Sequence, residues 1–299
     1  MSAPESSLPL VSVVLCTYND ERYIAQTIES VLGQTFKEFE FIIWNDGSKD
    51  GTESIIKSFN DPRIRYFYHN NTGLGMALSL ACQEAKGKYI ARIDGDDICV
   101  PNRFEREVHF LETHPECVLV SSSVIYIDEN GDMLGRSFPW TWNRNIKKKI
   151  NIVHPASMYR LEDYKKTCGY LNVLGCEDRI LWSKLKKYGN FHIIREPLIK
   201  YRLITTSLSH YISTSDSYTK MLEIIRKKME LEKDVCNDDI IVQNNIYQLS
   251  RAKTIKKEKY RYKKSIDEIL FSLLSFIISE KMAESSVVFL KNIYALLRY

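Results

Sequence analysis

The chain has 299 residues, 44% of them hydrophobic, which is enough apolar material for a full core and excludes a disordered protein. Its formal net charge of +4 is too small to indicate a polyanionic partner. Seven cysteines without a C-x-x-C pair favour reduced thiols and argue against a zinc site. The N-terminus carries no basic leader and no apolar run reaches the length of a membrane span, so we expect a cytoplasmic protein.

Strand and helix patterns alternate over the first part of the chain. Apolar runs predict strands at 10–18, 39–46, 63–69 and 88–94, and helical spacing predicts helices at 21–34, 52–59 and 73–87. This alternation predicts an α/β fold with a mostly parallel, doubly wound sheet flanked by helices. Ligands of such sheets bind at the carboxyl ends of the strands, where we expect the turns at 17–20, 45–48 and 94–97 to meet.

The remaining pattern is less regular. It predicts a helix at 102–115, a strand at 118–128 followed by a hairpin turn at Asn130-Gly131, a strand within 154–159, a helix at 175–190 and two short strands within 191–203. Farther on, the sequence becomes helical and strongly charged. We therefore predict a first domain at 1–210 and a helical C-terminal region at 211–299.

Three aspartates, Asp94, Asp96 and Asp97, follow a predicted strand directly. Carboxylate oxygens suit Mg²⁺ or Mn²⁺, and proteins usually hold such ions with one or two carboxylates plus substrate phosphates, which favours a diphosphate ligand. Gly95 permits a tight turn, so the aspartates need not share one role. The alternative is a solvated Asp-Gly turn, but clustered like charge at a strand end favours function.

Nucleotide-binding glycine loops are missing after the first strand. Neither G-x-G-x-x-G nor a P-loop occurs there, which argues against a dinucleotide oxidoreductase and a P-loop nucleotidase. Asp46 could accept a hydrogen bond from a base N–H, and Thr17 and Asn19 could position base or ribose. The alternative is an ordinary loop in which Ser48 or Asp50 caps the next helix.

The segments 9–36, 40–52 and 71–97 closely resemble, in order and spacing, the N-terminal half of the inverting glycosyltransferases of family two. The resemblance extends over roughly 8–202, because "GCEDRILWSKL" resembles the acidic motif of that family and "PLIKYRLITTSLS" its closing strand and loop. It implies the GT-A fold, a nucleotide-sugar donor with UDP preferred, and Mn²⁺ or Mg²⁺ held through a D-x-D motif.

The resemblance also implies roles for individual residues on the donor side. Asp96 would bind the metal, and the nucleotide-sugar would be bound by Thr17, Asn19, Asp46, Arg92, Asp94 and Asp97. Within this set, Arg92 would lie beside the base, and Asp97 would support the site or the donor sugar. One departure concerns Arg202, which is followed by Leu203 and Ile204 where many relatives have a histidine, so no third metal or phosphate contact is assigned in the 203–210 loop.

On the acceptor side, the resemblance makes Asp178 the general base and Glu177 its neighbour in acceptor binding. An acidic residue in the first turn of a helix is the alternative for Asp178. His154 borders the acceptor pocket in the family, although a satisfied core histidine is the commoner reading. Trp140 and Trp142 could form a platform for the acceptor sugar or anchor the loop by packing.

These features predict an inverting glycosyltransferase of bacterial surface polysaccharide synthesis. A base at Asp178 would activate an acceptor hydroxyl, and a metal at Asp96 would neutralise charge on the leaving diphosphate. Two alternatives stay open: a metal-dependent nucleotidyltransferase or phosphohydrolase, and a non-catalytic sugar-binding protein. No motif of an RNA-binding module is present, so we expect no nucleic-acid partner.

Residues 251–280 join a basic stretch to an apolar stripe with helical spacing. Such an amphipathic helix could dock on the anionic inner face of the cell membrane, which would suit an acceptor carried on a polyprenyl diphosphate. The alternative is a helical hairpin that packs on the first domain or on a second subunit in a homo-oligomer.

Overall fold

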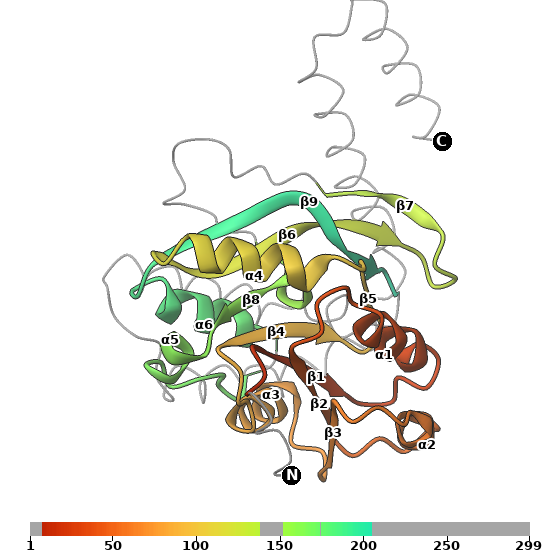
Figure 1. Ribbon diagram of the computed structural model, residues 1–299. Helices are drawn as coiled ribbons and strands as arrows, with labels where there is room; N and C mark the ends of the chain where they lie inside the picture. Colours follow the sequence, from red (N-terminus) through yellow and green to blue (C-terminus); the bar gives the residue numbers. More distant parts are fainter. Residues whose placement is uncertain (1–7, 138–151, 174, 205–299) are drawn as a thin grey trace, which may run out of the picture. The chain divides into compact units, whose positions relative to one another are not determined.

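A computed structural model describes residues 8–137, 152–173 and 175–204 (Figure 1). The first part of the chain alternates strands and helices as predicted: β1 Val11–Thr17, α1 Ile24–Leu32, β2 Phe39–Asn45, α2 Thr52–Ser58, β3 Ile64–Tyr68, α3 Leu74–Gln83 and β4 Tyr89–Asp94. The predicted C-terminal region, the loop beyond residue 204, Trp140 and Trp142 lie outside the described residues.

The second part of the described chain builds the other half of the sheet. Its elements are β5 Ile98–Cys99, α4 Arg103–Thr113, β6 Cys117–Ile127, β7 Met133–Arg136, a 3₁₀ turn at His154–Ala156, β8 Met158–Arg160, α5 Leu161–Lys165, α6 Glu177–Leu185 and β9 Asn190–Arg202. Gly131 adopts a positive φ of 96° in the β6–β7 turn, which confirms the predicted hairpin.

One sheet contains all of these strands, in the order β3-β2-β1-β4-β8-β6-β9-β5, with β7 paired to β6. β3, β2, β1 and β4 are parallel, as predicted. β8 joins β4 and β6 in antiparallel pairs, while β6 and β9 are parallel to each other. The sheet is therefore mixed.

β9 corrects the prediction of two short strands within 191–203. It is one strand of 13 residues with an irregular register, in which Ser122 pairs with Ile194 while the next residue of β6, Ser123, pairs with Pro197. Proline has no N–H to donate to a ladder, so the strand bulges there instead of ending.

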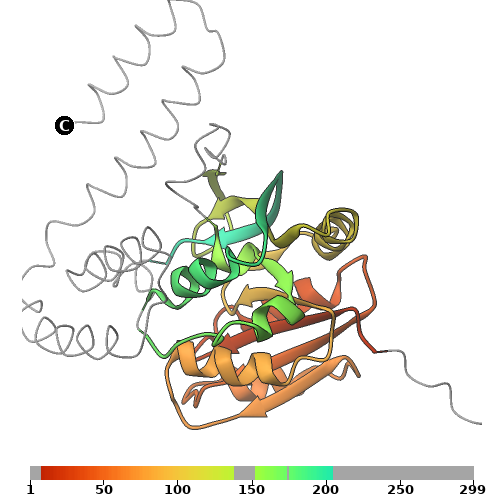
Figure 2. The same cartoon turned by 90° about the vertical axis from the view of Figure 1, so that its left-hand side faces the viewer.

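Both faces of the sheet are covered by helices (Figures 1 and 2). Along β1, Val13 and Leu15 belong to the core cluster that includes α1, α2 and α4. Val14 belongs to the second cluster, with α3, α5 and α6. Burial on both faces explains why β1 and β2 are continuous apolar runs, and it leaves the carboxyl ends of the strands as the place for polar groups.

Gly75, in the first turn of α3, lies against the segment that leads to α6. A Cβ at this position would collide with the main-chain oxygen of Leu171. We expect Gly75→Ala to lower the free energy of unfolding by about 1–3 kcal/mol, because a backbone segment must shift. Chemical denaturation measures the difference, with Gly135→Ala on β7 as the control, since nothing lies within 4 Å of a Cβ there. Equal losses in the two variants would contradict this packing.

Candidate active site

The turns after β1 and β2 meet at the carboxyl edge of the sheet. The Thr17 hydroxyl donates to Asp20 Oδ2 at 2.7 Å. Asn19 has a positive φ of 59°, and its main-chain N–H donates to the Ser48 hydroxyl at 3.0 Å. Its side-chain oxygen accepts the Lys49 N–H at 2.8 Å. The two loops are therefore locked together, and Thr17 and Asn19 lie where the sequence predicts a nucleotide.

Asp46 holds the start of α3. Its buried carboxylate accepts the main-chain N–H groups of Thr72 and Gly73, both at 2.9 Å, and the Thr72 hydroxyl at 3.0 Å. The alternative of an ordinary loop, in which Ser48 or Asp50 caps the next helix, also holds in part. The Asp50 carboxylate accepts the Thr52 N–H at the start of α2. Asp46 thus shapes the 72–73 backbone, and its contact with a base stays a prediction.

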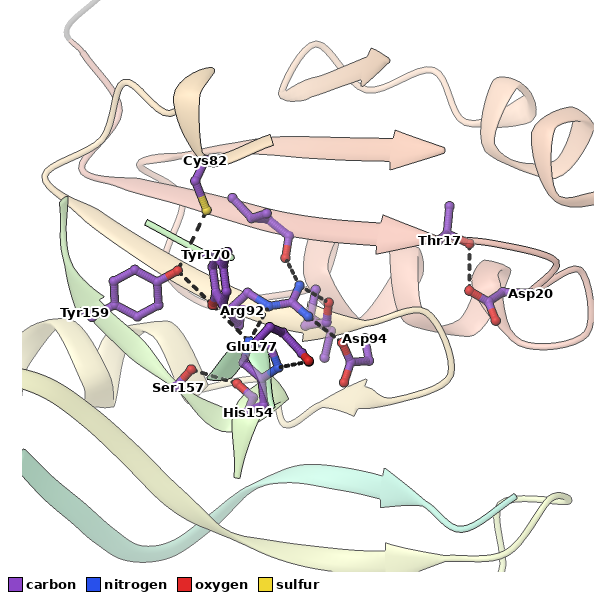
Figure 3. A network of polar contacts seen from close by, with 12 residues as sticks. Thr17, Asp20, Cys82, Arg92, Asp94, His154, Ser157, Tyr159, Tyr170 and Glu177 are labelled. Atoms are coloured by element: carbon purple, nitrogen blue, oxygen red, sulfur yellow. Dashed lines mark hydrogen bonds and ion pairs between the residues drawn. The ribbon is translucent and has the colours of Figure 1, made fainter. Parts of the chain in front are cut away.

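The turn at 94–97 sends its aspartates in different directions, as the glycine between them suggests. The Asp94 side chain is 33% exposed, and its Oδ1 accepts from the Arg92 guanidinium at 2.5 Å (Figure 3). Asp96 is half-buried. Asp97 is 1% exposed, and its Oδ1 accepts the main-chain N–H of Arg202 at 2.8 Å. Asp97 therefore faces β9, which fits support of the site rather than contact with a donor.

Asp20 is a fourth carboxylate that the sequence reasoning missed. It lies against Gly95 so closely that a Cβ there would collide with its Oδ2. Burial raises the pKa of Asp20 to about 6, and the charge of Asp94 adds to the effect. Burial likewise raises the pKa of Asp96 to about 7, with further contributions from Asp94 and Asp20. In the sequence, Asp20 could have been recognised as a candidate site residue because it ends the polar turn "TYND", directly after β1.

These carboxylates fit a hard divalent cation. Their oxygens are the ligands that Mg²⁺ and Mn²⁺ prefer, and a cation beside Asp96 would relieve the repulsion among Asp20, Asp94 and Asp96. Among the described residues, no group of three acidic, histidine or cysteine side chains could hold a metal ion by itself. The set therefore suits a cation that takes its other ligands from substrate phosphates.

Arg92 lies beneath the cluster rather than on it. Its exposed fraction is 0%, and one guanidinium nitrogen donates to the main-chain oxygens of Val14 and Ile93 at 2.8 and 2.9 Å. Its Nε donates to His154 Nε2 at 3.2 Å. The predicted place of Arg92 beside a base is corrected by this geometry, because the guanidinium is enclosed by protein and anchors Asp94 instead.

Glu177 and Asp178 open α6, as predicted. Glu177 is buried, and burial, reinforced by the charge of Asp178, raises its pKa to about 8. Burial also raises the pKa of the half-buried Asp178, whose Oδ1 accepts the Arg179 N–H at 2.6 Å. The charge of Asp94 contributes to both shifts. The end of β4 lies near the start of α6, because Arg92 is hydrogen-bonded to both Asp94 and His154, and His154 Nδ1 lies 3.9 Å from Glu177 Oε1.

His154 is enclosed behind this pair. Its Nε2 lies 2.9 Å from the Tyr170 hydroxyl, and its Nδ1 lies 3.9 Å from Glu177 Oε1. Burial and the nearby Arg92 charge hold its pKa well below the usual range, so the ring is neutral. With its side chain 11% exposed, His154 fits the alternative of a satisfied core histidine better than the predicted acceptor contact.

Arg202, the last residue of β9, contacts the aspartate turn. Its Nε donates to the main-chain oxygen of Asp96 at 2.8 Å, and one terminal nitrogen donates to Gln26 Oε1 at 2.9 Å. Its guanidinium also lies over the Tyr23 ring, 4.5 Å from the centroid. Arg202 thus connects the aspartate turn at 94–97 to α1 through hydrogen bonds, a role that the sequence did not indicate.

The raised pKa of Glu177 predicts a pH dependence of stability. The folded protein binds this proton more tightly than an unfolded chain with a carboxyl pKa of 4.5, so stability falls as pH rises from about 4.5 to about 8. We expect Glu177→Gln to reduce that fall in thermal unfolding between pH 5 and pH 8. Glu112→Gln is the control, because the Lys88 hydrogen bond lowers the pKa of Glu112. Identical slopes in wild type and Glu177→Gln would rule out the assignment.

Comparisons with known proteins agree with this geometry. The family model for Glycosyl transferase family 2 matches residues 12–164. The uncharacterized glycosyltransferase MJ1057 of Methanocaldococcus jannaschii is 37% identical over 210 residues, which cover 67% of this chain and 72% of the relative.

Two solved structures share the fold. Staphylococcus aureus TarS, residues 1–349 in complex with UDP-GlcNAc, has a TM-score of 0.62 at 19% identity, over 76% of this chain and 68% of that 1–349 chain. The mannosyltransferase PcManGT from Pyrobaculum calidifontis, in complex with GDP-Man and Mn²⁺, has a TM-score of 0.58 at 13% identity, over 98% of this chain and 82% of PcManGT.

The mixed sheet with helices on both faces has the GT-A fold of these two glycosyltransferases, as the sequence predicts. The chain belongs to glycosyl transferase family 2.

Proposed function

We propose that the protein is an inverting glycosyltransferase that moves a sugar from a nucleoside diphosphate sugar to a hydroxyl group of a surface glycan or a polyprenyl-diphosphate-linked acceptor. The observation that carries this proposal is geometric: Arg92 is hydrogen-bonded both to Asp94 and to His154, and His154 Nδ1 lies 3.9 Å from Oε1 of Glu177, the neighbour of Asp178. In this proposal Asp94 binds the donor, and Asp178, next to Glu177, acts as the base.

Asp178 is the base in this proposal. Its raised pKa makes it a stronger proton acceptor than an ordinary aspartate, which favours general base catalysis near neutral pH. Asp178 takes the proton of the acceptor hydroxyl while the oxygen attacks the anomeric carbon. The new carbon–oxygen bond forms as the bond from that carbon to the diphosphate breaks, and the bonding electron pair leaves with the nucleoside diphosphate. One displacement inverts the anomeric centre.

The donor side is assigned to the turns after β1, β2 and β4. Thr17 and Asn19 would bind the nucleoside, Asp46 would shape the loop beside it, and Asp96 would hold Mn²⁺ or Mg²⁺ with the diphosphate. When bound, such an ion neutralises charge on the leaving group. TarS in complex with UDP-GlcNAc and PcManGT in complex with GDP-Man and Mn²⁺ support this donor class, and UDP-sugars are the preferred choice.

A calorimetric screen of nucleotide sugars with and without Mn²⁺ tests the donor assignment. We expect one nucleoside diphosphate sugar to bind with Mn²⁺ present and to bind weakly after chelation by EDTA. The variant Asp163→Asn, which removes an acidic residue in the first turn of α5, serves as a control and should bind the same nucleotide sugar as wild type. Binding of every nucleotide sugar with equal weakness, with or without Mn²⁺, would remove the proposal in favour of the non-catalytic alternative.

Membrane contact through residues 251–280 belongs to the same proposal, because a lipid-linked acceptor would be presented at the membrane surface. Within the described ranges, no helix has the length and apolar character needed to cross a membrane. Flotation of the full chain with liposomes that contain anionic lipids tests the contact. Failure to float with them would leave helix packing, including packing on a second subunit, as the role of these residues.

A further inference from the structure

We propose that His154 is a positioning residue that connects the donor side of the site to its acceptor side through one fixed tautomer of its imidazole. This inference rests on the proposed function only in assigning Asp94 to the donor and Glu177 to the acceptor. Hydrogen bonds join Asp94 to Arg92 and Arg92 to His154, and His154 Nδ1 lies 3.9 Å from Glu177 Oε1 (Figure 3).

The first link fixes which nitrogen of His154 carries no hydrogen. A guanidinium has donors and no acceptor, so the Arg92 Nε–H must donate to a lone pair on His154 Nε2, 3.2 Å away. Arg92 has no freedom to turn away, because its terminal nitrogens are held by Asp94 and by main-chain oxygens of β1 and β4. Nε2 is therefore the unprotonated nitrogen of the ring.

A line of hydroxyl groups reinforces this assignment. The Tyr170 hydroxyl lies 2.9 Å from His154 Nε2, and the Tyr159 hydroxyl lies 3.1 Å from that of Tyr170. If Tyr170 donates to the imidazole, Tyr159 can donate to Tyr170 and the Cys82 thiol, 3.8 Å away, can donate to Tyr159. Tyr170 would then share with Arg92 the single in-plane lone pair of Nε2, and the hydroxyl chain behind it would be polarised in that direction.

The second link follows from the first. A neutral imidazole whose Nε2 is bare carries its proton on Nδ1, and this nitrogen faces Glu177 Oε1 at 3.9 Å. The separation is longer than a hydrogen bond, so the positive end of the N–H dipole faces the carboxyl oxygen without a hydrogen bond to it. Glu177 Oε2 is buried and has no partner among the described residues.

The ring itself is held in place by its surroundings. It lies in a 3₁₀ turn whose first carbonyl, that of His154, accepts the Ser157 hydroxyl at 2.7 Å. The Trp182 ring packs edge-on against the imidazole, with centroids 5.8 Å apart. A change at Asp94 when a donor binds would consequently reach Glu177 through Arg92 and a ring that cannot rotate.

Two substitutions separate the two links. The amide of His154→Gln can place an oxygen near the Nε2 position, so it keeps an acceptor for Arg92 and loses the donor toward Glu177. The amide of His154→Asn can place an N–H group near the Nδ1 position, so it keeps the donor toward Glu177 and leaves Arg92 Nε–H unpaired. His192, which stacks on Phe110 with centroids 4.1 Å apart, provides the control His192→Gln.

We expect the two variants to show opposite defects. His154→Asn should weaken the binding of UDP-GlcNAc or GDP-mannose with Mn²⁺, whichever binds wild type, by roughly 10-fold or more, because a buried charged donor loses its partner. His154→Gln should keep that affinity within about twofold and instead raise the carboxyl pKa of Glu177, followed by carbon-13 NMR. Equal defects in both variants would indicate a purely structural histidine and overturn the proposal.

A spectroscopic test on the wild-type protein does not depend on substrate or on the folding of variants. Nitrogen-15 NMR of the His154 imidazole should show the neutral form with the proton on Nδ1 throughout pH 6 to 8. A proton on Nε2, or a ring that titrates in this range, would overturn the inference. Because this spectrum needs no donor, its outcome is separate from the nucleotide-sugar screen that tests the proposed function.

Discussion

Asp178→Asn is expected to lower the rate of sugar transfer by roughly 10²- to 10⁴-fold, the usual contribution of a general base, while donor binding is unchanged. An amide cannot take the proton of an acceptor hydroxyl, yet it keeps the size of the carboxyl group and its hydrogen bond from the Arg179 N–H. Steady-state transfer rates and calorimetric donor titrations, measured on the same preparations, give the two quantities.

The control for this substitution is Asp163→Asn, another acidic residue in the first turn of a helix. Asp163 pairs with Lys166 at 2.8 Å on α5, away from the acidic cluster, and its loss should leave transfer unchanged. Wild-type turnover in Asp178→Asn would return Asp178 to the helix-terminus alternative, in which the acid only favours the start of α6.

Asp96→Asn is expected to remove most of the stimulation by Mn²⁺ and to lower transfer by roughly 100-fold or more, since a bound ion supplies several kcal/mol of charge stabilisation. The neutral amide is a weaker ligand for a hard cation, and it also removes a charge from the repulsive group with Asp94 and Asp20. Activity is measured as a function of Mn²⁺ concentration after treatment with EDTA.

Asp97→Asn is the matched control, one position farther along the chain. Burial raises the pKa of Asp97 well above its usual range, and its Oδ1 accepts the Arg202 N–H inside the protein, so it faces β9 and not a ligand. An amide should preserve the response to Mn²⁺. A shifted response in Asp97→Asn with none in Asp96→Asn would exchange the roles assigned to the two aspartates.

The parallel half of the fold could be predicted because its strands are buried on both faces. β1, β2 and β4 are continuous apolar runs, and each ends at a polar turn that parallel topology brings to one edge. The other half, which mixes parallel and antiparallel pairs, could not be derived in the same way. β8 has three residues and β5 has two, too few for a periodic pattern to be visible.

The candidate site was predicted in its residue types more accurately than in their orientations. The aspartate turn follows β4 and the acidic pair opens α6, as expected, because both positions depend on where a strand or a helix ends. Arg92 was misjudged because a residue in a central strand can point to either side of the sheet, and the sequence does not reveal that its guanidinium is buried under Asp94. Asp20 was missed because its importance arises from contact with Gly95, which is distant in sequence.

The most direct test of the central claim is an NMR analysis of the products formed from the nucleotide sugar that the screen selects. The account predicts one equivalent of nucleoside diphosphate for each sugar transferred, to acceptor or to water, and an anomeric proton whose coupling shows inverted configuration before the sugar can equilibrate. Retained configuration would contradict single displacement with Asp178 as base. Release of a nucleoside monophosphate together with a sugar phosphate would instead identify a phosphohydrolase.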